Sequence, residues 1–78
     1  MKRYKDISGR SGVTFYEIDG DSITIRFRDD DYEYVYNAER PGYAHVLAMQ
    51  QRAQLGRGLA AYINRFVRDD YAEKRPIS

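Results

Sequence analysis

Three tyrosines at alternate positions, Tyr32, Tyr34 and Tyr36, are the residues of this chain best suited by type and spacing to bind a ligand. Side chains at alternate positions of a strand point to one face, so the three rings would form a single aromatic stripe. Arg26 and Arg28 precede them on an adjacent strand-like segment. Rings that stack on bases, flanked by cations that contact phosphates, commonly hold single-stranded RNA. The pattern is therefore compatible with RNA binding.

More cations follow in the C-terminal half, where residues 37–78 carry seven basic and four acidic side chains. On a helix that begins after Gly58, the arginines fall on the outer face. The candidate nucleic-acid-binding residues are Tyr34, Tyr36, Arg26, Arg28, Arg57, Arg65 and Arg68. A buried tyrosine stripe with solvated arginines is the competing interpretation. A single-stranded RNA or tRNA partner and a protein partner or homodimer both stay open, since tyrosine and arginine also dominate protein interfaces.

The chain lacks the residue sets that catalysis and metal binding usually need. It has one histidine, His45, and no cysteine, and it has neither a Gly-x-Ser-x-Gly sequence nor a phosphate-binding glycine loop. His45 has no neighbour along its helix that could serve as a nucleophile or as an orienting partner. The Asp29-Asp30-Asp31 run is interpreted as an acidic turn rather than a hard-cation site, because further oxygen ligands at fixed spacing are missing. We expect no enzyme activity, no cofactor, no metal and no small-molecule substrate.

Composition limits the other function classes. The 78 residues are 32% charged, yet the net charge is only +1, which argues against a general polyanion binder. No apolar run resembles a signal peptide or approaches the ~20 residues of a membrane span, so a cytoplasmic protein without membrane contact is expected. A chain of this length buries only about 60% of its unfolded surface, which makes dimerisation a plausible source of stability.

Three segments have the features of β-strands. Residues 13–18 are rich in β-branched and aromatic types, and Asp19-Gly20 is a hairpin signal. Residues 22–28 alternate without a break, so Ile23, Ile25 and Phe27 should face inward. In the strand of residues 32–36, the tyrosines are expected on that same side, since Glu33 would otherwise enter the core. Glu33 is then free to pair with an arginine of the preceding strand.

Two amphipathic helices are predicted after the strands. The first begins near Tyr43 and stops at Gly56, and the second begins after Gly58. The predicted inner face of the second consists of Leu59, Tyr62, Ile63, Phe66 and Val67. The fold class is α+β, a three-stranded antiparallel meander followed by two short helices packed on one face. Residues 1–11 are expected to be a flexible arm, 12–74 one domain and 75–78 a tail.

Three features carry a family resemblance. The first is Tyr34-Val35-Tyr36, and the second is the strand pattern from Ile23 to Phe27. The most specific feature is the spacing of residues between Met49 and Tyr71, namely Ala53, Gly56, Gly58, Leu59, Tyr62-Ile63-Asn64, Val67 and Tyr71. In these features residues 12–74 resemble the KTSC domain, a short family named for the C-terminal region of some lysine-tRNA synthetases. It also occurs as stand-alone bacterial proteins.

The sequence departs from the KTSC pattern at two turns. The usual glycine between the second and third strands is replaced by residues 29–31, and the Val-Pro that commonly follows the tyrosines is replaced by residues 39–42. The family has no established function. Its association with a tRNA-charging enzyme implies RNA binding by analogy only, and no functional residue is carried over.

Overall fold

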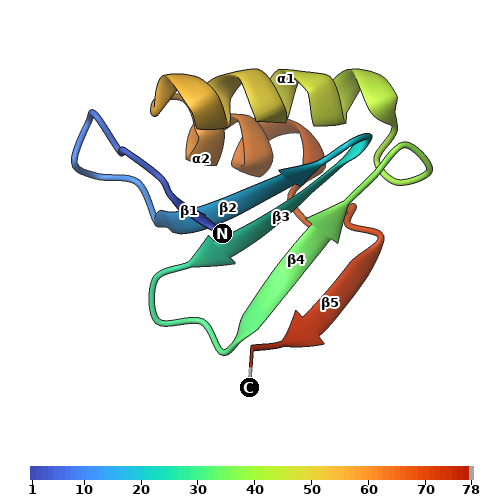
Figure 1. Cartoon of the computed structure of the whole chain (residues 1–78), viewed down its shortest axis with the longest axis horizontal. Coiled ribbons are helices and arrows are strands. Elements are labelled where there is room, and N and C mark those ends of the chain that lie inside the picture. Colours follow the sequence, from blue (N-terminus) through green and yellow to red (C-terminus); the bar gives the residue numbers. More distant parts are fainter. Residues whose placement is uncertain (78) are drawn as a thin grey trace.

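Alternating apolar and polar residues build one antiparallel sheet, which the computed structural model shows for residues 1–77, the part of the chain that it describes (Figure 1). The strands follow one another across the sheet in chain order, β1 Lys2–Arg3, β2 Val13–Asp19, β3 Ser22–Phe27, β4 Tyr32–Tyr36 and β5 Glu73–Pro76. Between β4 and β5 the chain forms α1 Tyr43–Leu55, α2 Leu59–Tyr62 and, continuing α2, the π-helical segment η1 Ile63–Val67. The fold class is α+β.

The sheet has five strands rather than the three predicted. The predicted meander is present as β2, β3 and β4, and one further strand lies at each edge. β1 pairs with β2, and β5 pairs with β4 in a register that sets Lys74 opposite Tyr34. Alternation could not reveal either strand, because β1 has only two residues and β5 has the sequence Glu-Lys-Arg-Pro with no apolar alternation.

Packing extends beyond both predicted domain boundaries. Tyr4, in the segment 1–11 expected to be an arm, is only 3% exposed. Its hydroxyl accepts a hydrogen bond from the Leu59 N–H at 3.3 Å, which ties this segment to the start of α2. The segment 75–78, expected to be a tail, supplies the last two residues of β5; its Ser78 lies outside the described residues.

The tyrosines of β4 face the helices, as predicted. Directly opposed residues of antiparallel strands share a face, and Tyr36 lies opposite Ile23 while Tyr34 lies opposite Ile25. Both isoleucines and Tyr36 are buried in the core. The helices complete this core with Val46, Met49, Ala53, Leu59, Ile63 and Val67. The predicted faces of β3 and β4 are therefore confirmed.

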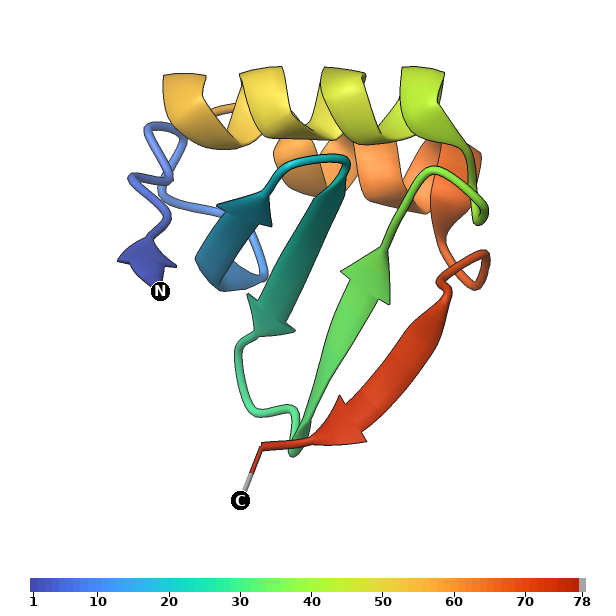
Figure 2. The same ribbon diagram turned by 45° about the vertical axis from the view of Figure 1, so that its right-hand side comes forward.

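The helices cover only one end of the inner face of the sheet (Figures 1 and 2). α1 is held there by Gln50, whose Nε2 donates to the carbonyl oxygens of Gly20 at 2.8 Å and Ser22 at 3.1 Å, around the turn between β2 and β3. In both views the other ends of β4 and β5 extend beyond the helices. The inner face is thus covered near Tyr36 and uncovered toward the start of β4.

The helix boundaries match those predicted from the glycines, but the second helix does not bury all the residues predicted for its inner face. Gly56 ends α1 in the left-handed conformation, with φ 81°, and its N–H donates to the carbonyl oxygen of Arg52. The second helix begins after Gly58, as predicted. Phe66, predicted to be buried, is 54% exposed. A π turn joins residues five apart and holds more residues per revolution than an α turn. Because η1 is π-helical, the rotation of 100° per residue that an α-helix has does not apply to it, and Phe66 points outward.

Candidate nucleic-acid interface

A cleft of about 360 Å³ opens on the inner side of β3, β4 and β5, beside the end of η1. Its aromatic lining comes from segments far apart in the chain, with Phe27 ending β3, Tyr34 and Tyr36 in β4, and Tyr71 preceding β5. Ring centroids lie 5.6 Å apart for Phe27 and Tyr34, 5.1 Å for Tyr34 and Tyr71, and 6.3 Å for Tyr36 and Tyr71. The rings form a continuous aromatic wall.

Exposure of the tyrosine stripe increases along β4 away from the helices. Tyr36 is 1% exposed, and its hydroxyl donates to the carbonyl oxygen of Arg68 at 3.2 Å. Tyr34 is half-buried, and Tyr32, at the start of the strand, is 40% exposed. The stripe is therefore neither wholly packed nor wholly open. Tyr36 belongs to the core, whereas Tyr34 and Tyr32 offer ring surface to a ligand.

The turn before β4 fixes the position of Tyr34. Asp30 accepts a hydrogen bond from the Tyr34 hydroxyl at 2.7 Å through Oδ2 and one from the Tyr32 N–H at 3.0 Å through Oδ1. Burial, followed by this hydrogen bond to Asp30, raises the pKa of Tyr34 to about 12. Burial also raises the pKa of Tyr36. The hydrogen bond to Asp30 also holds the ring of Tyr34 in one orientation.

The polar lining of the cleft is balanced in charge. It comprises two cations, two carboxylates and one amide, namely Arg68, Lys74, Asp30, Asp69 and Asn64. Lys74 reaches from β5 over the stripe, with Nζ 4.4 Å from the ring centroid of Tyr32 and 5.8 Å from that of Tyr34. Because the charges compensate, ring surface and hydrogen-bonding groups determine which ligand fits. A neutral planar group with polar edges, such as a nucleobase, matches this lining.

Three of the seven predicted site residues, Tyr34, Tyr36 and Arg68, meet at this cleft. The other four, all arginines, lie elsewhere. Arg28 is exposed in the connection after β3. Its Nη2 donates to a backbone carbonyl oxygen of the loop before β2, at 3.4 Å. Arg57 is exposed in the connection between α1 and α2. The predicted residues therefore do not form one surface.

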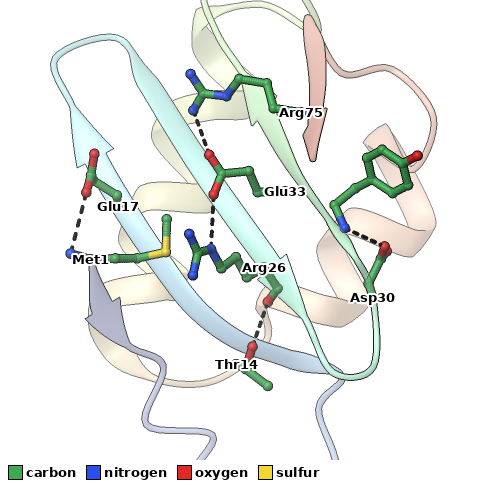
Figure 3. A network of polar contacts seen from close by, with 8 residues as sticks. Met1, Thr14, Glu17, Arg26, Asp30, Glu33 and Arg75 are labelled. Atoms are coloured by element: carbon green, nitrogen blue, oxygen red, sulfur yellow. Dashed lines mark hydrogen bonds and ion pairs between the residues drawn. The ribbon is translucent and has the colours of Figure 1, made fainter. Parts of the chain in front are cut away.

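Arg26 lies on the sheet face that the helices do not cover, in an ion-pair network (Figure 3). Its Nε is 3.0 Å from Oε1 of Glu33, and Nη2 of Arg75 is 2.9 Å from Oε2 of the same carboxylate. The predicted pairing of Glu33 with an arginine of the adjacent strand is confirmed. Arg26 links β3 to β4 instead of joining the tyrosines, since neighbouring strand positions point to opposite faces.

Arg65 borders a second hollow that adjoins the cleft. The two hollows share Asn64, Arg68 and Asp69 at the end of η1. The guanidinium of Arg65 lies 5.3 Å from the ring centroid of Phe66, which lines the same hollow. Arg65 is thus a neighbour of the cleft, although it does not line it.

The cleft also contains residues that the tyrosine and arginine pattern did not identify. Asn64 and Tyr71 occur in the KTSC-like spacing, which was the signal that could have marked them. Phe27 and Asp30 were predicted as core and turn residues, without a role in a site. Lys74 had no signal, because its position depends on the unpredicted strand β5.

Residues 1–77 contain neither a metal-binding cluster nor a membrane-spanning helix. In that range, no three side chains of histidine, cysteine, aspartate or glutamate are grouped so that they could hold a metal ion. The Asp29–Asp31 segment serves as a turn, with Asp29 in the left-handed region at φ 60°. Across the same residues, each helix is too short or too polar to cross a membrane.

Comparison of the chain with protein-family models, with curated proteins and with solved structures gives no match in any of the three.

Proposed function

We propose that this chain is a non-enzymatic, KTSC-like domain that binds single-stranded RNA, with an unstacked base seated in the cleft between β4 and η1. One observation carries the proposal: the half-buried rings of Tyr34 and Tyr71 lie 5.1 Å apart in a cleft that Arg68 and Lys74 also line. Stacking of a base on an aromatic side chain contributes about 1–3 kcal/mol, and nearby cations attract the phosphates. An RNA ligand fits an expected cytoplasmic location.

The KTSC resemblance assigns no functional residue, but residues that carry it gather at the same site. Tyr34 and Tyr36 come from its Tyr-x-Tyr feature, and Asn64 and Tyr71 come from its helical spacing. These four residues span nearly half of the chain, yet all four line the cleft. Tyr36 is needed for packing in any case, whereas Asn64 is exposed on η1 and has no packing role. A π-helical segment beside the cleft points the same way, because such turns are rare and recur at functional sites.

A binding assay with matched variants tests the proposal. Labelled mixed-sequence single-stranded RNA is titrated at low and moderate salt, and we expect affinity that falls as salt rises, because phosphate contacts release counterions. Arg68→Ala and Lys74→Ala should each weaken binding severalfold. Arg28→Ala and Arg57→Ala are the matched controls, since both side chains are exposed and neither lines the cleft. Absence of binding at low salt, or equal losses in all four variants, refutes the proposal.

Protein interaction or self-association is the second candidate, and the outer surface of α1 favours it. Tyr43 and Leu55 are each more than half exposed there, and Leu47 is also exposed. Tyr43 and Leu47 lie one turn apart, and exposed apolar side chains on a surface helix are a common feature of protein interfaces. Self-association predicts a mass that rises with concentration in sedimentation. A constant monomer mass at every concentration excludes the homodimer.

A further inference from the structure

Two adjoining hollows at the end of η1 differ in charge. In the cleft, Arg68 and Lys74 are matched by two carboxylates. The second hollow, of about 390 Å³, has three arginines, Arg40, Arg65 and Arg68, against the two carboxylates of Asp69 and Asp70. Arg68 lines both hollows. The neutral part of a nucleotide therefore suits the cleft, and its anionic part suits the second hollow.

The size of the cleft suits a small planar ligand such as a base. Small-ligand pockets usually measure about 300–1,000 Å³, so a cleft of about 360 Å³ lies at the lower end of this range. In the proposed arrangement one base lies beside Tyr34 and Tyr71. Because Arg68 lines both hollows, the linking phosphate and a further base can continue from the cleft past Arg68 into the second hollow.

Phe66 provides a surface for that further base. Its ring is 54% exposed and lines the second hollow, and its centroid lies 4.8 Å from that of Tyr62. The guanidinium of Arg65 lies over the same ring, so the stacking surface here consists of an aromatic ring together with a guanidinium plane. Arg40 is less available, because its Nε is 2.7 Å from Oδ1 of Asp70.

We propose that the site reads a footprint of two nucleotides, with one base in the cleft, the linking phosphate between Arg68 and Arg65, and the next base on Phe66. This inference rests on the proposed function, since it names the form of the RNA that the same site binds. It excludes Arg26, Arg28 and Arg57 from the phosphate path.

Two variants with separate readouts test the footprint. For single-stranded nucleic acid, the slope of log affinity against log salt changes by about 0.7 for each phosphate contact. Arg65→Ala should therefore reduce the slope measured with a short single-stranded RNA by about 0.7, and Arg65→Lys should restore it. Phe66→Ala should weaken binding of a dinucleotide by about fivefold or more while leaving the affinity for a mononucleotide unchanged, as measured by amide-shift titration. Circular dichroism checks that each variant is folded, and Arg57→Ala serves as control.

The outcomes separate the two proposals. If the wild-type protein binds no RNA at low salt, the proposed function fails. If the wild-type protein binds RNA and Lys74→Ala weakens binding, the RNA proposal stands. The footprint is then wrong if Arg65→Ala keeps the wild-type salt slope. It is also wrong if Phe66→Ala keeps the wild-type affinity for the dinucleotide. A loss of slope in Arg57→Ala equal to that in Arg65→Ala also overturns the footprint, because it would mean a diffuse phosphate contact.

Discussion

The hydroxyl of Tyr36 donates a hydrogen bond to the carbonyl oxygen of Arg68 at 3.2 Å and so joins the end of β4 to the end of η1. We expect Tyr36→Phe to lower the free energy of unfolding by about 0.5–1.5 kcal/mol, because the carbonyl loses its partner while the packed ring stays. Urea denaturation would measure this. Tyr43→Phe, which alters an exposed ring on α1, should leave the urea midpoint nearly unchanged. A midpoint for Tyr36→Phe equal to that of the wild type would show that the bond does not contribute.

Stability should fall at alkaline pH because of the buried phenols. The pKa values of Tyr34 and Tyr36 are raised above the ordinary value of 10.0. The unfolded chain therefore loses these protons at lower pH than the folded chain, and the contribution to stability is complete below pH 10.0 and decreases as pH rises toward about 12. Unfolding midpoints measured between these pH values should fall. In Tyr34→Phe the fall should be smaller, and an equal fall in that variant would contradict the assignment to Tyr34.

A side chain at Gly56 should be costly. The residue has φ 81°, and an added Cβ would lie 2.6 Å from Cβ of Lys5. Gly56→Ala combines the left-handed penalty of about 1–2 kcal/mol with this steric conflict. Gly9→Ala is the matched control, since Gly9 has φ 73° but nothing within 4 Å of the new atom. Thermal unfolding should show a clearly larger loss for Gly56→Ala, and equal losses would mean that the contact with Lys5 relaxes freely.

Glu33 should matter more to stability than an exposed carboxylate does. Its side chain is 13% exposed, and it contacts arginines of both flanking strands. We expect Glu33→Gln to cost about 1 kcal/mol or more, since both ion pairs are weakened in a partly desolvated position. The pair of Arg40 and Asp70 is exposed on both sides, so Asp70→Asn should cost about 0–1 kcal/mol. Chemical denaturation compares the two, and a larger loss in Asp70→Asn would refute this ranking.

The sequence predicted those elements whose pattern is local. Alternation from Ile23 to Phe27 identified the inner face, and Gly56 and Gly58 marked the helix boundary. It did not reveal β5, because a polar edge strand is defined by its backbone pairing with β4 and not by its side chains. The predicted position of Phe66 was also wrong, because the helical spacing of apolar residues does not reveal a π turn.

The candidate site was predictable only in part, for the same reason. Tyr34, Tyr36 and Arg68 were identified from their types and spacing, and the structure brings them to one cleft. Arg26 was wrongly assigned to the tyrosine surface. Successive residues of a strand point to opposite faces of the sheet, and Arg26 lies opposite Glu33, on the face away from the tyrosines. Lys74 depends on a pairing between segments about 40 residues apart, which no local pattern encodes.

Within the described residues, the buried core ends at Val67, whereas the cleft is completed by Tyr71 and Lys74. The aromatic lining of the cleft is itself packed in or against this core, whereas Lys74 lies outside it. Lys74, which is exposed on β5 and lines the cleft, could be randomised in a library without repacking the interior, so that variants would inherit a common framework and differ in the ligand they select. For protein engineering, the domain would act as a small scaffold with an exchangeable residue in its last strand.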